Sequence, residues 1–235
     1  MQDAIFFDLD GTLLGLDIGR FVPQYFASLV DKIGEGFPEF PFRERLLAGA
    51  EAMLQGRQDG ESVAEAFDRV FFQGASPDLE RRLRSAFSEY YRVGFEGLRP
   101  HTERLPVAEE VVREGRRHAR TLVLATNPLF PREATLARVR WAGVDARLFD
   151  GITTYEDATA LKPDVAYYTG LLEDFGARPE ESWMVGNDLL EDGMAKEAGM
   201  SFYFVEGPYA LRRPGAPPPD RKGSLAEALS FLRTL

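Results

Sequence analysis

The sequence predicts an α/β protein with a doubly wound parallel sheet and a second, smaller, all-helical domain. Apolar runs of β-forming residues alternate with helical patterns in residues 1–16 and 95–235, as expected for strands that are buried on both faces. Residues 17–94 show helical periodicity alone. Alternating strands and helices form parallel sheets through right-handed crossovers. We therefore assign 1–16 and 95–235 to an α/β core domain and 17–94 to a helical domain.

The composition is that of an ordinary globular chain, with 235 residues of which 44% are hydrophobic and 28% charged. The net charge of −10 argues against nucleic acid as a partner, because such binding depends on clustered lysine and arginine. The chain has no cysteine, which excludes disulfide frameworks and thiolate metal sites. No apolar run reaches membrane-spanning length and no signal-peptide pattern is present, so we expect a cytoplasmic protein without a membrane partner.

The first strand is predicted at residues 4–7, and two carboxylates follow it, Asp8 and Asp10, before Gly11. Ligands bind at the carboxyl edge of open α/β sheets. Two carboxylates this close repel each other unless a cation shares their charge, which indicates a divalent metal. The simpler alternative for these acids is a solvated turn or a helix cap.

Four helices are predicted within residues 17–94. Ser62 and Glu65 have the spacing of a capping box at the start of the third, and Ser76-Pro77 begins the fourth. The apolar faces contain, helix by helix, Ile18, Val22, Tyr25, Leu29 and Ile33; Leu46, Leu47, Ala50 and Leu54; Val63, Phe67, Val70 and Phe71; and Leu79, Leu83, Phe87 and Tyr90.

This helical insert follows the first strand directly, so we expect it to fold over the carboxyl edge of the sheet as a lid. Most of its aromatic side chains are expected to form its own core. Phe21, Tyr25 and Tyr91 could instead face a substrate, and the sequence does not separate these alternatives.

A second buried strand is predicted at residues 121–125, after an amphipathic helix over 105–117. The strand ends in Thr126 and Asn127, and Pro131 then begins a helix that reaches Gly143. Thr126 could bind a ligand at this edge or act as a plain helix cap. Residues 151–154 are expected to form an edge strand.

Lys162 precedes Pro163, which we place in the first turn of a helix that ends at Gly176. A cation gains nothing from the helix dipole at an N-terminus, so this position favours a functional lysine over a solvated one. The apolar face of this helix contains Val165, Tyr168, Leu172 and Phe175.

A third buried strand, at residues 182–185, is followed by an acidic loop over 186–193 and a helix to Gly199. One carboxylate would be enough to stabilise the helix N-terminus, and this loop has several. Residues 202–205 form the next predicted strand. Residues 212–223 are interpreted as a surface loop, and residues 224–235 as a short closing helix.

In this order the motifs resemble those of the haloacid dehalogenase superfamily, in the phosphoglycolate phosphatase and β-phosphoglucomutase-like branch with a helical cap after the first motif. The resemblance implies a Rossmann-like core and a bound Mg²⁺. It makes Asp8 the nucleophile and Asp10 the general acid/base, and both would help to hold the metal. Thr126 would bind phosphoryl oxygens, and Asn127 would orient nucleophile or substrate. Lys162 would balance the negative charges.

The acidic loop departs from this pattern at one position. Many members of the superfamily have Gly-Asp where this chain has Gly186-Asn187. We assign the metal ligand to Asp188, because Asp188 and Asp192 keep the three-residue gap of the motif. Asn187 could still orient a metal-bound water, and Asp192 could accept a hydrogen bond from the groups around the metal.

The resemblance implies a magnesium-dependent phosphohydrolase that forms an aspartyl-phosphate and acts on a small phosphorylated metabolite, such as a sugar phosphate or phosphoglycolate. A phosphomutase of the β-phosphoglucomutase type is one alternative, and a catalytically silent binding protein is another. A dehalogenase is disfavoured, because that branch needs neither Asp10 as acid/base nor magnesium. No sequence pattern in residues 17–94 identifies the substrate.

Overall fold

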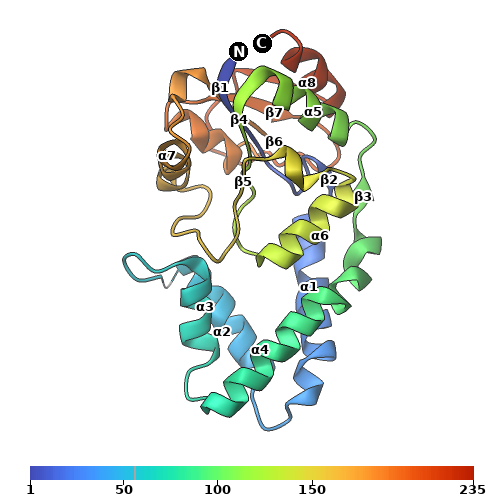
Figure 1. Cartoon of the computed structure of the whole chain (residues 1–235), viewed down its shortest axis with the longest axis vertical. Coiled ribbons are helices and arrows are strands. Elements are labelled where there is room, and N and C mark those ends of the chain that lie inside the picture. Colours follow the sequence, from blue (N-terminus) through green and yellow to red (C-terminus); the bar gives the residue numbers. More distant parts are fainter. Residues whose placement is uncertain (56) are drawn as a thin grey trace.

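The computed structural model describes residues 1–55 and 57–235, and a six-stranded sheet lies in the upper part of the molecule as drawn in Figure 1. The strand order is β5-β4-β1-β6-β7-β8, and every neighbouring pair is parallel. The predicted parallel sheet is therefore confirmed. The strands are β1 Gln2–Phe7, β4 Ala119–Leu124, β5 Gly151–Ile152, β6 Ser182–Gly186, β7 Ser201–Val205 and β8 Arg221–Gly223.

Helices cover both faces of this sheet, as a doubly wound fold requires. Side chains of β1 alternate between two apolar clusters: Ile5 and Phe7 pack with α5, α6 and α8, whereas Ala4 and Phe6 pack with α7. This burial on both faces explains why β1 is an unbroken apolar run. The helices are α5 Ala108–His118, α6 Arg132–Ala142, α7 Val165–Asp174 and α8 Leu225–Leu232.

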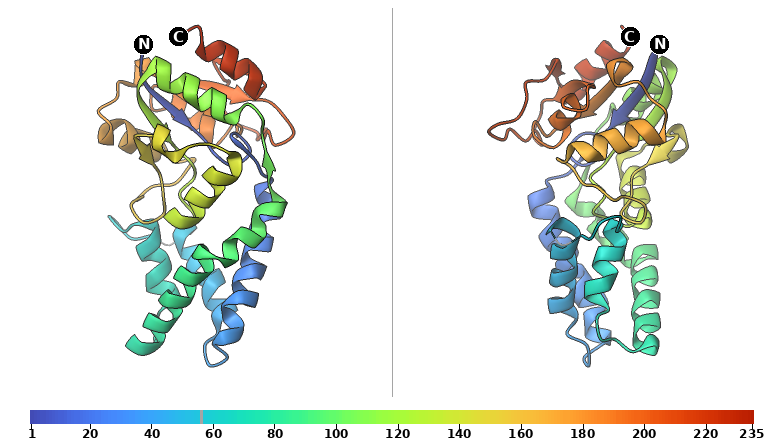
Figure 2. Two further views of the ribbon diagram at one scale, coloured as in Figure 1. Left: turned by 45° about the vertical axis from the view of Figure 1, so that its right-hand side comes forward. Right: turned by 90° about the vertical axis from the view of Figure 1, so that its left-hand side faces the viewer.

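The predicted helical insert is present beyond the carboxyl edge of the sheet (Figures 1 and 2). Ser62 and Glu65 form the capping box at the start of α3, and Pro77 occupies the first turn of α4, both as predicted. The helices are α1 Ile18–Lys32, α2 Phe42–Gln55, α3 Val63–Phe71 and α4 Pro77–Arg92, with the 3₁₀ segments η1 Gly34–Gly36 and η2 Gly94–His101.

A short antiparallel ribbon connects the insert to the core. It pairs β2 Leu14–Gly15 with β3 Glu103–Arg104, so the chain leaves and re-enters the core side by side. Within residues 1–55 and 57–235, none of the helices combines the length and apolar character needed to cross a membrane.

Three local predictions were wrong. The Lys162–Pro163 peptide is cis and Asp164 is the N-cap of α7, so Pro163 lies before the helix and not in its first turn. The acidic loop leads into a short 3₁₀ helix, η5 Asp192–Lys196, instead of an α-helix. Residues 221–223 form the edge strand β8 within the presumed loop. The other 3₁₀ segments are η3 Ala146–Leu148 and η4 Pro179–Glu181.

Candidate active site

The polar residues predicted to act together follow three adjacent strands. β1 lies between β4 and β6, and parallel strands present their carboxyl ends at one edge of the sheet. Asp8 directly follows β1, Asn187 directly follows β6, and Thr126 comes two residues after β4. The Asp8 N–H continues the β1–β6 ladder by donating to the Val185 carbonyl at 2.9 Å. The sheet therefore fixes the backbone positions of Asp8 and Asn187.

Both carboxylate oxygens of Asp8 have a partner. Lys162 Nζ donates to Asp8 Oδ1 at 3.0 Å. Thr12 Oγ1 lies 3.0 Å from Asp8 Oδ2 and also 3.0 Å from Asn187 Oδ1. Because a hydroxyl has a single proton, Thr12 can donate to only one of these two oxygens at a time. One acceptor beside Thr12 is thus always free for another ligand.

Gly11 makes the approach of Asn187 to this turn possible. Its φ of +89° lies in the left-handed region that favours glycine. A Cβ at this position would come within 2.2 Å of Asn187 Nδ2. The sequence Asp-Gly-Thr therefore brings Thr12 back toward Asp8 while leaving room for Asn187.

Lys162 is the cation at the centre of the site. Its side chain is only 1% exposed, and Nζ donates to Asp192 Oδ1 at 2.6 Å as well as to Asp8. Burial alone would lower the pKa of Lys162, but the carboxylates of Asp192 and Asp8 raise the pKa well above its usual value. The ammonium therefore stays charged and compensates two carboxylates that come from different strand ends.

Asp192 anchors the acidic loop beneath Lys162. Its Oδ2 accepts the N–H of Asp188 at 2.9 Å, and a Cβ on Gly186 would meet this oxygen at 2.1 Å. Only glycine fits at the end of β6 for this reason. Burial raises the pKa of Asp192 to about 7, and the Lys162 ammonium opposes that rise.

Asp188, the predicted metal ligand of this loop, has one carboxylate oxygen with hydrogen-bond donors and a second, buried oxygen without one among the described residues. Its Oδ1 accepts the N–H groups of Leu190 and Glu191 at 2.9 and 3.0 Å, and its Oδ2 lies 2.9 Å from Arg213 Nη2. Asp188 is linked to Lys162 through its backbone N–H, which donates to the Asp192 carboxylate. Direct metal contact by Asp188 stays a prediction.

Thr126 and Asn127 join the site from the end of β4. The Thr126 carbonyl accepts a hydrogen bond from Tyr167, whose ring centroid lies 5.9 Å from Lys162 Nζ. Asn127 Nδ2 donates to the Lys162 carbonyl at 3.3 Å and to Glu191 Oε2 at 3.1 Å. Asn127 Oδ1 is buried and has no hydrogen-bond partner among the described residues. This oxygen can accept a donor from a bound molecule.

Asp10 has a partner that the sequence analysis missed. The fully buried Arg138 of α6 forms an ion pair with Asp10 Oδ2 through Nη1, and its Nη2 donates to Thr135 Oγ1 at 3.2 Å. The Arg138 guanidinium also lies 4.0 Å above the Phe130 ring. The signal that could have pointed to Arg138 is its position four residues from Ala134 and from Ala142, on a helix face that is otherwise buried.

The environment of Asp10 acts on its pKa in both directions. Burial raises the pKa, Arg138 lowers it, and the nearby Asp8 charge raises it again, so that the pKa lies above its ordinary value. Asp10 Oδ1 is buried and has no hydrogen-bond partner within residues 1–55 and 57–235. A proton or a cation would satisfy this oxygen.

The donor atoms fit magnesium in type and number. Magnesium prefers oxygen ligands and is commonly held by one or two carboxylates, with water and substrate phosphate at the other positions. Asp8 and Asp10 supply two carboxylates, and the free Asp10 Oδ1 is an acceptor that a cation would satisfy. No cluster of three or more His, Cys, Asp or Glu side chains arranged to hold a metal is found in the described part of the chain. A metal here would therefore depend on water or substrate for its remaining ligands.

The arrangement combines a fixed carboxylate, a buried ammonium and a second carboxyl with a raised pKa. Such a set can attack an electrophile, neutralise the anion that it carries and transfer a proton. The predicted Lys162 contacts both the predicted Asp8 and Asp192 of the acidic loop.

A family model described as haloacid dehalogenase-like hydrolase matches residues 2–199 of the chain. No curated protein matches it. Solved structures do, over nearly the whole length of both chains, and all of those given below are under 25% identical, so they show the fold alone.

A haloacid dehalogenase-like phosphatase from Thermococcus onnurineus is 24% identical, with a TM-score of 0.57 over 98% of this chain and 97% of that chain. CbbY from Rhodobacter sphaeroides, in complex with phosphate, is also 24% identical, with a TM-score of 0.59 over 97% and 96%. A 2-haloacid dehalogenase from Pseudomonas syringae pv. tomato DC3000 is 22% identical, with a TM-score of 0.68 over 100% and 99%.

Proposed function

The chain belongs to the haloacid dehalogenase-like hydrolases, and from this premise we propose that it is a magnesium-dependent phosphohydrolase acting on a small phosphorylated substrate. One observation carries the proposal. Lys162 and Thr12 each approach an Asp8 oxygen to 3.0 Å, which orients the carboxylate and compensates its charge. Asp10, two residues further on, provides the proton donor that a phosphate ester needs and a halide does not.

In the first proposed step, an Asp8 oxygen forms a bond to phosphorus while the bond from phosphorus to the ester oxygen breaks. The product is an aspartyl-phosphate and an alkoxide, and Asp10 donates its proton to the alkoxide. Lys162 balances the charge of the phosphoryl oxygens, and Thr126 and Asn127 bind and orient the phosphoryl group.

In the second step Asp10 takes a proton from water while the water oxygen forms a bond to phosphorus and the bond from phosphorus to the Asp8 oxygen breaks. Inorganic phosphate leaves, and Asp8 is again a carboxylate. The raised pKa of Asp10 supports this role, because the group must be protonated in one step and ionised in the next. Magnesium, when bound by Asp8, Asp10 and the predicted ligand Asp188, supplies Lewis-acid neutralisation of the phosphate oxygens.

The first prediction concerns the nucleophile. Asp8→Asn should reduce the hydrolysis of p-nitrophenyl phosphate in the presence of Mg²⁺ by on the order of 10³-fold or more, because the attacking oxygen anion is lost. Asp31→Asn, at an exposed position of α1, is the matched control and should leave the rate unchanged. Magnesium-dependent turnover that persists in Asp8→Asn would contradict the mechanism.

Assays with other substrates separate the alternatives. Formation of an isomer of a sugar phosphate without free phosphate would identify a mutase. Release of chloride from 2-chloropropionate by the native protein, with no phosphate release from any ester, would identify a dehalogenase. Inactivity on both substrate classes, with and without Mg²⁺, would favour a silent binding protein.

A further inference from the structure

A cavity of about 360 Å³ lies between the helical insert and the core. Helices α1 to α4 form most of its wall, and residues 129–131 after β4, with Tyr155 and Glu156, close it on the core side. Its volume is within the range of small-molecule sites. The mechanism proposed above makes no use of this space.

The wall of this cavity is mainly aromatic and aliphatic. Phe26, Met53, Phe67 and Phe87 all line it, and they come from the four different helices of the insert. Tyr25 and Tyr91 contribute ring surface, and their hydroxyls lie 2.5 Å apart, so that one of them donates to the other. A ligand here gains mainly from the removal of apolar surface from water.

The charged groups of the wall are already compensated or are acidic. Arg84 is the only cation among the described residues that line the cavity, and it pairs with Asp68 at 2.9 Å and with Glu80 at 2.7 Å. The other charged lining residues are Asp68 itself, Glu133 and Glu156. A second phosphate or carboxylate on the ligand would therefore have no free positive partner, and the two glutamates would repel it.

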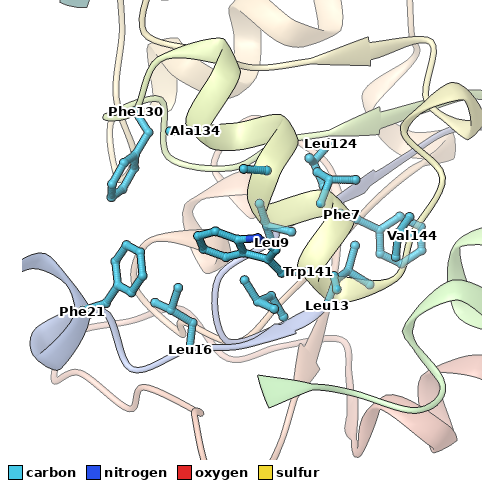
Figure 3. Close-up of a cluster of buried hydrophobic side chains, with 14 of the residues drawn as sticks. Phe7, Leu9, Leu13, Leu16, Phe21, Leu124, Phe130, Ala134, Trp141 and Val144 are labelled. Carbon is cyan, nitrogen blue, oxygen red and sulfur yellow. The ribbon is translucent and has the colours of Figure 1, made fainter. Parts of the chain in front are cut away.

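One side chain of the cavity wall, Phe130, links the cavity to the pair of Arg138 and Asp10. Phe130 lines the core side of the cavity, and the Arg138 guanidinium, which pairs with Asp10, lies 4.0 Å from the centroid of the same ring. Phe130 also packs against Phe21 of α1, with ring centroids 6.2 Å apart (Figure 3). Phe130 thus contacts both the apolar cavity and the pair of Arg138 and Asp10.

We propose that this cavity binds the non-phosphate part of the substrate, and that the substrate is a phosphate monoester of an apolar aryl or alkyl alcohol instead of a polyhydroxylated sugar. The inference rests on the proposed phosphohydrolase function. The phosphate binds near Asp8 and Lys162, and the apolar group extends past Phe130 into the insert. A sugar would leave most of its hydroxyls without partners in such a cavity.

The test compares kcat/KM for n-alkyl phosphates from ethyl to decyl with that for glucose 6-phosphate. We expect kcat/KM to rise about fourfold for each methylene that enters the cavity, until the cavity is full. Ala50→Phe fills the cavity from α2 and should reduce kcat/KM for octyl phosphate at least tenfold while leaving ethyl phosphate unchanged. Ala226→Phe, at an exposed position of α8, is the matched control and should alter neither.

Binding of 1-octanol, measured by calorimetry, provides a readout without catalysis. The wild type should bind it with a negative heat-capacity change, and Ala50→Phe should not. Equal rates along the alkyl series, a preference for glucose 6-phosphate, or octanol binding unaffected by Ala50→Phe would overturn the assignment of the cavity. Absence of hydrolysis of every ester, with octanol still bound, would instead overturn the proposed function.

Discussion

Lys162 compensates the charge of two buried carboxylates. The intact cluster and a cluster that has lost one member have very different effects on the free energy of unfolding. Bringing three charged groups out of water is costly, so the intact cluster contributes little net stability. Removal of one member is different, because it leaves a buried charge without a partner. The side chains of Lys162 and Asp192 are each 1% exposed, so water cannot replace the missing charge.

We therefore expect Lys162→Met to lower the free energy of unfolding by about 3–5 kcal/mol and to abolish activity. Addition of Asp192→Asn should recover part of this stability, since one uncompensated carboxylate is removed. Urea unfolding of the single and double variants measures both effects.

Lys196→Met is the matched control for this prediction. Lys196 pairs with Asp220 at 2.6 Å, but their side chains are 25% and 39% exposed, so the loss should stay within about 1 kcal/mol. A Lys162→Met protein as stable as the Lys196→Met protein would show that the buried cluster is not ionic.

Most site residues that the sequence could predict follow strands, and Lys162 was predicted from its place before a helix. Asp8, Thr126 and the acidic loop each come after an apolar run, and the topology of a parallel sheet brings such positions together. Arg138 could not be predicted as the partner of Asp10, because the pairing depends on how α6 packs against the turn after β1. The choice of Asp192 over Asp188 as the Lys162 partner likewise depends on the path of the loop.

Among the elements, buried strands and capped helices were predictable and polar edge elements were not. The Ser62 capping box marks the start of α3 through local chemistry alone. β8 has no apolar run, because an edge strand of three residues with Arg221 and Lys222 exposed has little surface to bury. Pro163 fits a helical first turn as well as the turn before a helix, and only the fold decides between them.

The packing of α2 on α3 gives a prediction about glycine. A Cβ at Gly49 would lie 2.7 Å from the Phe67 ring, so Gly49→Ala should lower the free energy of unfolding by about 1–2 kcal/mol although alanine favours helices. Gly170 of α7 has nothing within 4 Å of such a Cβ. Gly170→Ala should therefore raise the free energy of unfolding by about 0.5–1 kcal/mol.

Thermal and urea unfolding of Gly49→Ala and Gly170→Ala test whether the two substitutions change the free energy of unfolding in opposite directions. Stabilisation by Gly49→Ala would mean that Phe67 moves aside at no cost. Such a result would also weaken the description of the cavity, because Phe67 forms part of its wall.

At the scale of the whole molecule, the core and the insert share one apolar cluster. The cluster includes Phe7 of β1, continues through Leu16 and Phe21 at the entry to the insert, and reaches Phe71 of α3. The Trp141 ring of α6 stacks on Phe95 of η2 with centroids 5.1 Å apart. Separate unfolding of the insert would expose this shared surface, which couples the two parts energetically.

We therefore predict a single cooperative transition, even though residues 17–94 were assigned to a domain of their own. Trp141 reports on the junction, whereas Trp183 of β6 packs on Phe231 of α8, with ring centroids 4.7 Å apart. Urea unfolding followed by tryptophan fluorescence in Trp183→Phe and in Trp141→Phe should give midpoints that coincide with those from circular dichroism of the same variant. A junction midpoint well below the circular dichroism midpoint would mean that the insert unfolds first, because the shared cluster is then too weak to couple it to the sheet.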